Sequence, residues 1–247
     1  MNLKRYSQLE DRRQTAYEKM YTAKIRKALI SQTKHYIETG DLDNSMRLVV
    51  NEMYEVLMTD YLQRQWVQLQ NNTLEKKTNF FIDTWKRWIQ DFMMENLTMR
   101  VTNIDDTTRE RLRNATLEGA TAGETKAQIA DRILKVMEGN ATKQRARMIA
   151  RTETGEAVNL AKTKSADDWE AETGMKIGKI WLHRGAKDPR DWHMSLDNGR
   201  VIPKDVPFIV NNPNTGESDK MMYPHDQSAS PGNVINCGCQ VLYRRMK

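Results

Sequence analysis

The sequence predicts an α+β fold in which a long N-terminal helical region is followed by a small, mostly antiparallel C-terminal α+β module. Two observations support this. Residues that interrupt helices gather late in the chain, since all six prolines follow Met175. At the same point the spacing of apolar residues changes from helical to short extended runs. We therefore divide the chain into a helical docking region at 1–100, a second helical part at 101–174 and the module at 175–247.

Three helices fill the first region. Apolar residues recur at helical spacing from about residue 3 to 38, and Gly40 ends this helix. Asp43 or Asn44 is expected to cap a second helix that ends near Leu69. A third helix carries a dense set of aromatic side chains: Phe80, Phe81, Trp85, Trp88 and Phe92. This set is interpreted as core; the alternative is a groove that faces a partner.

The second helical part contains shorter helices separated by glycines. The run Asp105-Asp106-Thr107-Thr108 is expected to cap a helix that ends at the turn around Gly123. Thr125 or Glu124 is expected to open a further helix, which ends at Gly139. Almost all of the chain before the module is therefore predicted to be helical.

A long helix is predicted from about Thr142 to Thr173, with Gly174 as its end. Glu153 falls on the apolar face of this helix, together with Ala146, Ile149, Ala157 and Leu160. A buried carboxylate needs a partner, and Arg190 is the cation expected to provide it. The alternative is that Glu153 lies at the edge of the apolar face and reaches water.

The module, in which strands are expected only after Lys176, is predicted to contain five short extended segments. They are Lys179–Arg184, Arg200–Ile202, Pro207–Val210, Lys220–Tyr223 and Val234–Tyr243. A single helical turn is expected at Asp191–Leu196. The spacing of three residues would then direct Arg190 and His193 to the same side.

Zinc is one ligand that the module could bind, and a zinc-stabilised DNA-binding module is one alternative for its function. His183, His193, His225, Cys237 and Cys239 offer suitable donor atoms. A Cys-x-Cys pair on a strand places both sulfurs on one face, so His193, Cys237 and Cys239 form the predicted metal site. The alternative is that one cysteine packs in the core and the other caps the strand. A disulfide within so short a loop would be strained, and reduced thiols are expected.

Catalysis is a second possibility for the same residues. His193 could act as a general base beside Glu153 and Arg190, in a nuclease or in a nucleotidyl or ADP-ribosyl transferase. The sequence has none of the phosphate-binding glycine loops, zinc-protease motifs or serine-hydrolase motifs that would identify an enzyme. No catalytic residue and no cofactor is therefore predicted, and a structural polar network is the preferred interpretation.

Charge and hydropathy restrict the expected partners. The net charge of +6 is divided between the two ends of the chain without a concentrated basic stripe, which favours at most weak contact with DNA. Apolar runs are too short to cross a membrane, and the first residues do not resemble a secretory signal. A protein made in the cytoplasm, without a membrane partner, is expected.

Several motifs in the second half of the chain occur in a distinctive order. They comprise Ala150-Arg151-Thr152-Glu153, Asn159, Arg190 with His193, Asp197 with Gly199, Phe208, Tyr223-Pro224 with Asp226, and Ile235-Asn236-Cys237 with Cys239. In this order and spacing, residues from about 100 to 245 resemble the Mu F-like head morphogenesis family, the minor head proteins of tailed bacteriophages. His225 and Gly238 depart from the family pattern, in which a small residue and a basic residue are expected.

The resemblance implies a structural role inside the phage head, in a protein made in the bacterial host. Expected partners are the portal protein, the scaffold or the major capsid protein, and weakly the genomic DNA; the expected processes are procapsid assembly and DNA packaging or delivery. The motif residues are expected to form a structural polar network. Its members are Arg151, Thr152, Glu153, Asn159, Arg190, His193, Asp197, Asp226 and Asn236.

Overall fold

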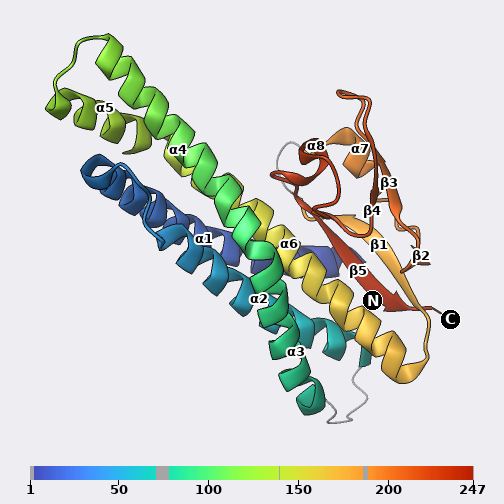
Figure 1. Ribbon diagram of the computed structural model, residues 1–247. Helices are drawn as coiled ribbons and strands as arrows, with labels where there is room; N and C mark the ends of the chain where they lie inside the picture. The colour runs from blue at the N-terminus through green and yellow to red at the C-terminus, as the bar shows by residue number, and fades with distance from the viewer. Residues whose placement is uncertain (1–2, 71–77, 139, 186–188, 247) are drawn as a thin grey trace. The chain divides into compact units, whose positions relative to one another are not determined.

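The computed structural model describes residues 3–70, 78–138, 140–185 and 189–246 (Figure 1). Two compact units are present. The sheet unit comprises Met1–Tyr17, Tyr54–Ile89 and Arg151–Lys247, and the helical unit comprises Glu18–Met53 and Gln90–Ala150. These units do not follow the linear boundaries expected at residues 100 and 174, because several long helices contribute residues to both.

The predicted fold class is confirmed. Within the described ranges every strand follows Lys176, and the preceding chain consists of helices and their short connections. Among all the described residues, no helix is long and apolar enough to cross a membrane.

The first two helices agree closely with the sequence prediction. Helix α1 spans Leu3–Thr39 and ends at Gly40, whose φ of 82° suits glycine. Helix α2 spans Ser45–Gln70. A carboxylate oxygen of Asp43 accepts a hydrogen bond from the backbone N–H of Ser45 at 2.9 Å, so Asp43 supplies the expected cap.

The next helical segment is longer than the sequence predicted. Helix α3 (Thr78–Phe92), the π-helical turn η1 (Met93–Leu97) and helix α4 (Thr98–Thr121) follow one another without a break. The helix start expected at Asp105–Thr108 is therefore wrong. The hydroxyl groups of Thr107 and Thr108 donate to backbone carbonyls four residues earlier, a bonding pattern that helix interiors allow.

The aromatic residues of α3 contribute to the core of the sheet unit only in part. Trp85 is buried, and its ring meets that of Trp66 at 5.8 Å between centroids. The ring of Phe81 lies 4.5 Å from the same indole, although Phe81 itself is half-buried. The side chain of Phe80 lies outside the described residues.

The last two long helices lie close to the predicted ranges. Helix α5 spans Lys126–Glu138 and opens with a capping box, in which Thr125 and Gln128 exchange side-chain to backbone hydrogen bonds. Helix α6 spans Asn140–Thr173 and stops at Gly174, which has a φ of 68°. Gly139, expected as the end of α5, is outside the described residues.

In the helical unit, α4 and α5 form a helical hairpin. Leu112 and Ala115 from α4 pack against Ile133 and Met137 from α5, and the side of α1 near Tyr36 adds to this core. Gly119 allows the close approach, because a Cβ there would lie 2.8 Å from a side-chain carbon of Ile129.

The sheet unit contains two small antiparallel sheets. Strands β2 (Ile202–Pro203), β1 (Ile177–His183) and β5 (Cys239–Arg245) are ordered β2-β1-β5, with Trp181 opposite Val241. Strands β3 (Phe208–Asn211) and β4 (Ser218–Met221) form a hairpin. Two single-turn helices lie between the strands, α7 (Asp191–Met194) and α8 (Pro231–Val234).

The faces of the larger sheet are buried against different partners. Ile180, Leu182 and Leu242 pack on Leu3 and Tyr6 of α1. Alternation along the strand directs Trp181 to the opposite face, into a cluster with Phe208, Val210, Met221, Val234 and the two cysteines.

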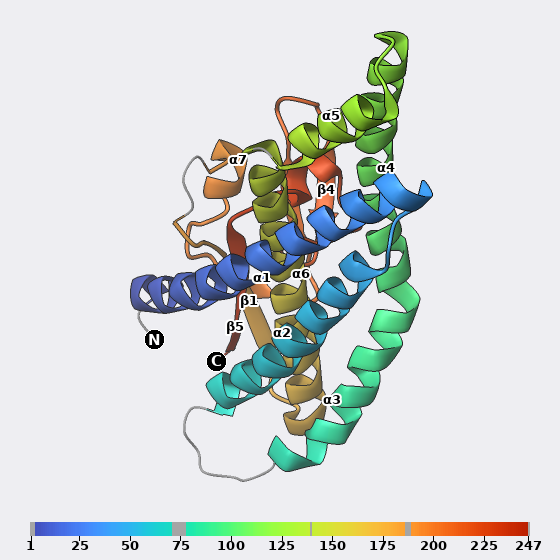
Figure 2. The same cartoon turned by 90° about the vertical axis from the view of Figure 1, so that its left-hand side faces the viewer.

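The free edge of β5 is covered by two amide side chains. Asn159 of α6 accepts a hydrogen bond from the backbone N–H of Val241 at 2.8 Å, and Gln68 of α2 donates to the carbonyl of Tyr243 at 2.9 Å. In both views β5 lies next to the part of α6 that follows Arg151 (Figures 1 and 2). These contacts satisfy backbone groups that an exposed edge would leave unpaired.

Candidate functional site: polar clusters around α6 and β5

Three predicted metal ligands come together in the sheet unit. The sulfur of Cys237 lies 3.4 Å from Nδ1 of His193, and the sulfur of Cys239 lies 3.8 Å from the same nitrogen. All three side chains are buried, and both cysteines are free thiols. We call His193, Cys237 and Cys239 the thiol cluster.

The protein fold determines where each member of the thiol cluster lies. His193 belongs to the single-turn helix α7, which confirms the helical turn predicted from Asp191, and Arg190 before it is extended. Cys239 is the first residue of β5, and Cys237 precedes it by two positions. Two segments more than forty residues apart are therefore joined at this point.

Further polar residues support the imidazole of His193. Its Nε2 lies 3.4 Å from the side-chain oxygen of Asn233, which also accepts a hydrogen bond from the indole of Trp192 at 2.8 Å. The amide nitrogen of Asn233 donates to Asp219 at 2.7 Å. The ring of Trp181 meets the imidazole edge-on, with centroids 5.4 Å apart. The contacts with Cys237, Asn233 and Trp181 together fix the orientation of the imidazole.

The two thiols differ in acidity. The pKa of the Cys237 thiol is lowered overall, chiefly by the hydrogen bond from Cys239. Burial acts in the opposite direction, and the neighbouring His225 and His193 lower the pKa further. The same contact and burial raise the pKa of Cys239. A negative charge on this pair would therefore lie on Cys237.

His225 is a buried residue beside this cluster. It is fully buried, and its φ of 68° is unusual for a residue with a side chain. Among the described residues neither ring nitrogen forms a hydrogen bond to an oxygen or nitrogen atom, and the polar neighbour of the ring is the Cys237 thiol, whose pKa it lowers. The ring rests on α6 at Gly155, where a Cβ would lie 2.3 Å from Nε2. Gly155 therefore makes room for this imidazole.

Glu153 is buried as predicted, but its expected pairing with Arg190 is wrong. Tyr54 of α2 donates its hydroxyl to Glu153 at 2.7 Å and lies 3.3 Å from a carboxylate oxygen of Glu156. The guanidinium of Arg190 instead donates to the backbone carbonyl of Ile235 at 2.7 Å. The packing of α2 against α6 provides a donor that the pattern of α6 alone did not reveal.

Four other motif residues connect α6 to the loop that precedes β5 and to the free edge of β5. The N–H of Asn236 donates to the hydroxyl of Thr152 at 2.9 Å, and Arg151 reaches the Asn236 side chain at 3.5 Å. Asn159 donates to the carbonyl of Pro224 at 2.9 Å, in addition to its contact with β5. Arg151, Thr152, Asn159 and Asn236 thus act together in holding the loops on α6.

The remaining two motif residues organise local turns. Asp197 accepts a hydrogen bond from the N–H of His183 at 3.2 Å. Asp226 accepts from the N–H of Met222 at 2.8 Å and from both the N–H and the hydroxyl of Ser228. Asp197 and Asp226 therefore shape the loops and do not join the thiol cluster directly.

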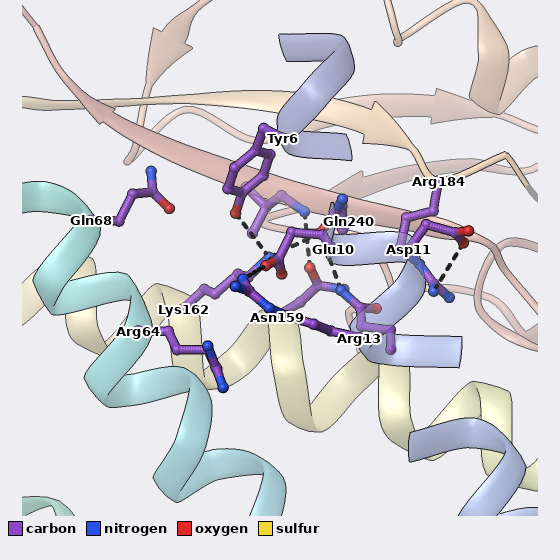
Figure 3. A network of polar contacts seen from close by, with 12 residues as sticks. Tyr6, Glu10, Asp11, Arg13, Arg64, Gln68, Asn159, Lys162, Arg184 and Gln240 are labelled. Carbon is purple, nitrogen blue, oxygen red and sulfur yellow. Dashed lines mark hydrogen bonds and ion pairs between the residues drawn. The ribbon is translucent and has the colours of Figure 1, made fainter. Parts of the chain in front are cut away.

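Sequence reasoning missed a buried ion pair between α6 and α1 (Figure 3). The ammonium of Lys162 lies 3.1 Å from Glu10 of α1, with the two side chains 2% and 4% exposed. It also donates to the side chain of Gln240 on β5 at 2.9 Å, which Gln14 contacts at 3.1 Å. The hydroxyl of Tyr6 lies 3.3 Å from the same ammonium. We call Tyr6, Glu10, Gln14, Lys162 and Gln240 the ion-pair cluster.

Burial and charge act in opposite directions within this ion pair. Burial raises the pKa of Glu10, but the charges of Lys162 and Arg13 outweigh it and lower the pKa overall. Burial lowers the pKa of Lys162, and Glu10 only partly offsets this. One feature of the sequence could have indicated that Lys162 is buried: helical spacing places it on the same face as Val158, Ser165 and Trp169. All four side chains are buried in the structure.

A second buried lysine lies on β1. Lys179 is fully buried, donates to the carbonyl of Met222 at 2.8 Å and lies 5.0 Å from the ring centroid of Phe208. Burial lowers its pKa to about 8, although Asp205 and Asp226 act in the opposite direction. This lysine links the larger sheet to the end of β4.

Comparison with known proteins gives one family and one curated relative. A model of the family described as Phage Mu protein F like protein matches residues 110–242, which is more than half of the chain. The uncharacterized protein YqbB of Bacillus subtilis (strain 168) is 28% identical over 154 residues, which cover 62% of this chain and 46% of YqbB. The chain thus spans about half the length of that relative. No solved structure matches.

Proposed function

Because the chain belongs to the Phage Mu protein F like family, we propose that it is a minor head protein of a tailed bacteriophage. In this proposal the protein lies inside the head at the portal vertex and acts in procapsid assembly and in DNA packaging or delivery. The observation that carries the proposal is the extent of the family match. It includes the second half of α4, all of α5 and α6, strands β1 to β4 and the first part of β5, so it covers the scaffold as well as the motifs.

The buried clusters favour a structural role over an enzymatic one. A catalytic site built on Glu153, Arg190 and His193 would need the three side chains around one substrate. Glu153 is bound to Tyr54, Arg190 to the backbone of Ile235, and His193 is only 1% exposed. Glu153 links α6 to α2, and Arg190 and His193 link segments within the module, which is the function expected of structural polar contacts.

The helical unit offers a surface suited to the portal protein. A groove is lined by Arg47, Asn51, Gln90, Met93, Met94, Leu97 and Thr98. Met94 is 78% exposed at the π-helical turn, and a turn of this kind often marks a functional position. Flexible methionine side chains adapt to an apolar helix, and we assign this groove to a helix of the portal protein.

Point variants test this assignment better than truncation. Deletion of residues 1–100 would remove parts of both units. We therefore compare Met94→Glu in the groove with Leu117→Glu, a 54% exposed position of α4 outside the groove. Both positions are exposed, so neither variant should change the melting temperature by much.

The measurement is co-sedimentation of the purified protein with portal rings of the same phage. The wild type and Leu117→Glu should sediment with the rings, and Met94→Glu should remain in the supernatant. Equal binding of both variants would contradict the groove assignment. Co-sedimentation of the wild type with capsid or scaffold assemblies but not with portal rings would contradict the portal as partner.

Contact with genomic DNA is proposed to be weak. The chain carries a net charge of +6 that is not concentrated in one segment, which supports only a few phosphate contacts. Binding to a short DNA duplex should be detectable at low ionic strength and lost at physiological salt. Retention of tight binding at physiological salt would contradict this part of the proposal.

A further inference from the structure

We propose that the thiol cluster of His193, Cys237 and Cys239 binds one structural zinc ion. The inference concerns the stability of the module and does not depend on the proposed role in the phage head. Its basis is the convergence of three buried donor atoms, all within 4.8 Å of one another.

The distances within the cluster match those of a tetrahedral zinc site. With bonds of about 2.3 Å to sulfur and about 2.0 Å to nitrogen, tetrahedral angles place ligand atoms roughly 3.5 to 3.8 Å apart. The two sulfur to nitrogen distances here are 3.4 and 3.8 Å. A zinc ion can therefore be accommodated with little movement of the three side chains.

The chemistry of the donors favours zinc over other ions. Two thiols and an imidazole are soft or borderline ligands that suit zinc, whereas calcium and magnesium need oxygen ligands. The cluster itself contains no carboxylate. All three ligands are buried, which is typical of closed structural sites and unlike the open position of catalytic zinc.

The surroundings of His193 resemble the outer shell of a metal site. Nδ1 faces the two sulfurs, and Nε2 faces the side-chain oxygen of Asn233, which is anchored in turn to Asp219. A histidine ligand usually donates its other ring N–H to such an acceptor, which fixes the tautomer and raises the basicity of the metal-bound nitrogen.

His225 is the residue that we assign to the fourth position. It is fully buried, and its ring lies beside the Cys237 thiol, whose pKa it lowers through its charge and a hydrogen bond. A buried imidazole is costly unless its nitrogens are paired, and coordination to the same ion as Cys237 would pair one of them.

The module also has a structural need for an internal link. Between β1 and β5 the described residues form two strands of four residues, one of two residues and two single-turn helices. The buried core of these short elements is the single cluster around Trp181, which includes both cysteines, and metal ligation is a common source of stability in small modules. Zinc would join α7 to the start of β5, at opposite ends of this irregular segment.

The experiment measures metal in the full-length protein purified without a polyhistidine tag. Mass spectrometry of the metals should find about one zinc ion per chain. Cys237→Ser, Cys239→Ser and His193→Gln should reduce zinc to background and lower the melting temperature. His35→Gln, which changes the histidine of the helical unit, is the matched control and should retain zinc. A strong zinc chelator should lower the melting temperature of the wild type and leave that of Cys237→Ser unchanged.

Each result decides part of the proposal. Folded wild-type protein that contains no zinc and does not gain thermal stability when zinc is added would overturn the site, even if the cysteine variants fail to fold. Replacement of zinc by cobalt should give the charge-transfer absorption of thiolate ligands, and its absence would exclude Cys237 and Cys239 as ligands. Unchanged zinc affinity in His225→Gln would overturn the assignment of the fourth ligand alone.

Discussion

The ion-pair cluster and the thiol cluster are both buried in the sheet unit, but only the first contains formal charges of both signs. Lys162 and Glu10 neutralise each other, and the amide of Gln240 completes the coordination of the ammonium. The thiol cluster consists of two thiols and an imidazole, which are donor groups for a metal cation. Histidine is the only one of its members that could carry a positive charge. In the ion-pair cluster the charges balance within the chain, whereas the proposal for the thiol cluster is that a bound ion supplies the positive charge.

The largest expected effect comes from breaking the ion pair on one side only. Glu10→Gln leaves the ammonium of Lys162 buried without its charge partner and should lower the free energy of unfolding by about 3 to 5 kcal/mol. The double variant Glu10→Leu with Lys162→Met removes both charges and should be less destabilised than the sum of the single changes. Urea unfolding provides the measurement. Additive losses would show that the two groups do not interact.

A smaller loss is expected at the contact between α6 and His225. Alanine in place of glycine normally stabilises a helix by up to about 1 kcal/mol. At Gly155 the new methyl group would collide with the imidazole, so Gly155→Ala should destabilise the protein by about 1 to 3 kcal/mol. In a His225→Ala background the same change should be neutral or stabilising. Thermal melts of the four proteins measure this sign change, and the same loss in both backgrounds would contradict the packing account.

A pH-dependent contribution is expected from Lys179. Its pKa falls from 10.5 when unfolded to about 8 when folded, so the unfolded state binds more protons between these values. Stability from this group should therefore rise as the pH increases from 8 towards 10.5. Lys179→Met should remove the rise, so the difference in unfolding free energy between variant and wild type should change across this range. A difference that is constant with pH would contradict the burial of the charged ammonium.

The smallest effect is expected for an exposed ion pair. Arg64 contacts Asp60 one helical turn earlier at 2.7 Å, with the two side chains 43% and 25% exposed. Arg64→Gln should change the free energy of unfolding by less than about 1 kcal/mol, and added salt should reduce the difference further. A loss as large as that of Glu10→Gln would show that burial does not explain the contrast between these pairs.

The helix and strand pattern was largely predictable because it depends on local features. Gly40 and Gly174 end helices where the apolar period stops, and alternation identified β1. The error at Asp105–Thr108 has a local cause as well. Hydroxyl groups that cap a helix can also bond within one, and nothing in the sequence distinguished the two arrangements.

The candidate site was predictable only where its members are neighbours in the chain. The spacing of Cys237 and Cys239 indicated a shared face, and His193 lies beside both. Tyr54 is separated from Glu153 by 99 residues, so the partner of this carboxylate could not be inferred from α6. The burial of Lys162 was not predicted because a lysine among small residues is typical of a solvent-exposed helix face. In the structure this part of α6 is buried on nearly every side.

The most direct test of the contrast between the two clusters is X-ray absorption at the zinc edge of the purified wild-type protein. The account predicts a four-coordinate ion with two sulfur atoms at about 2.3 Å and two nitrogen atoms at about 2.0 Å. This result would assign the metal to Cys237, Cys239 and two histidines. A first shell of oxygen and nitrogen without sulfur, or folded protein without bound zinc, would contradict it.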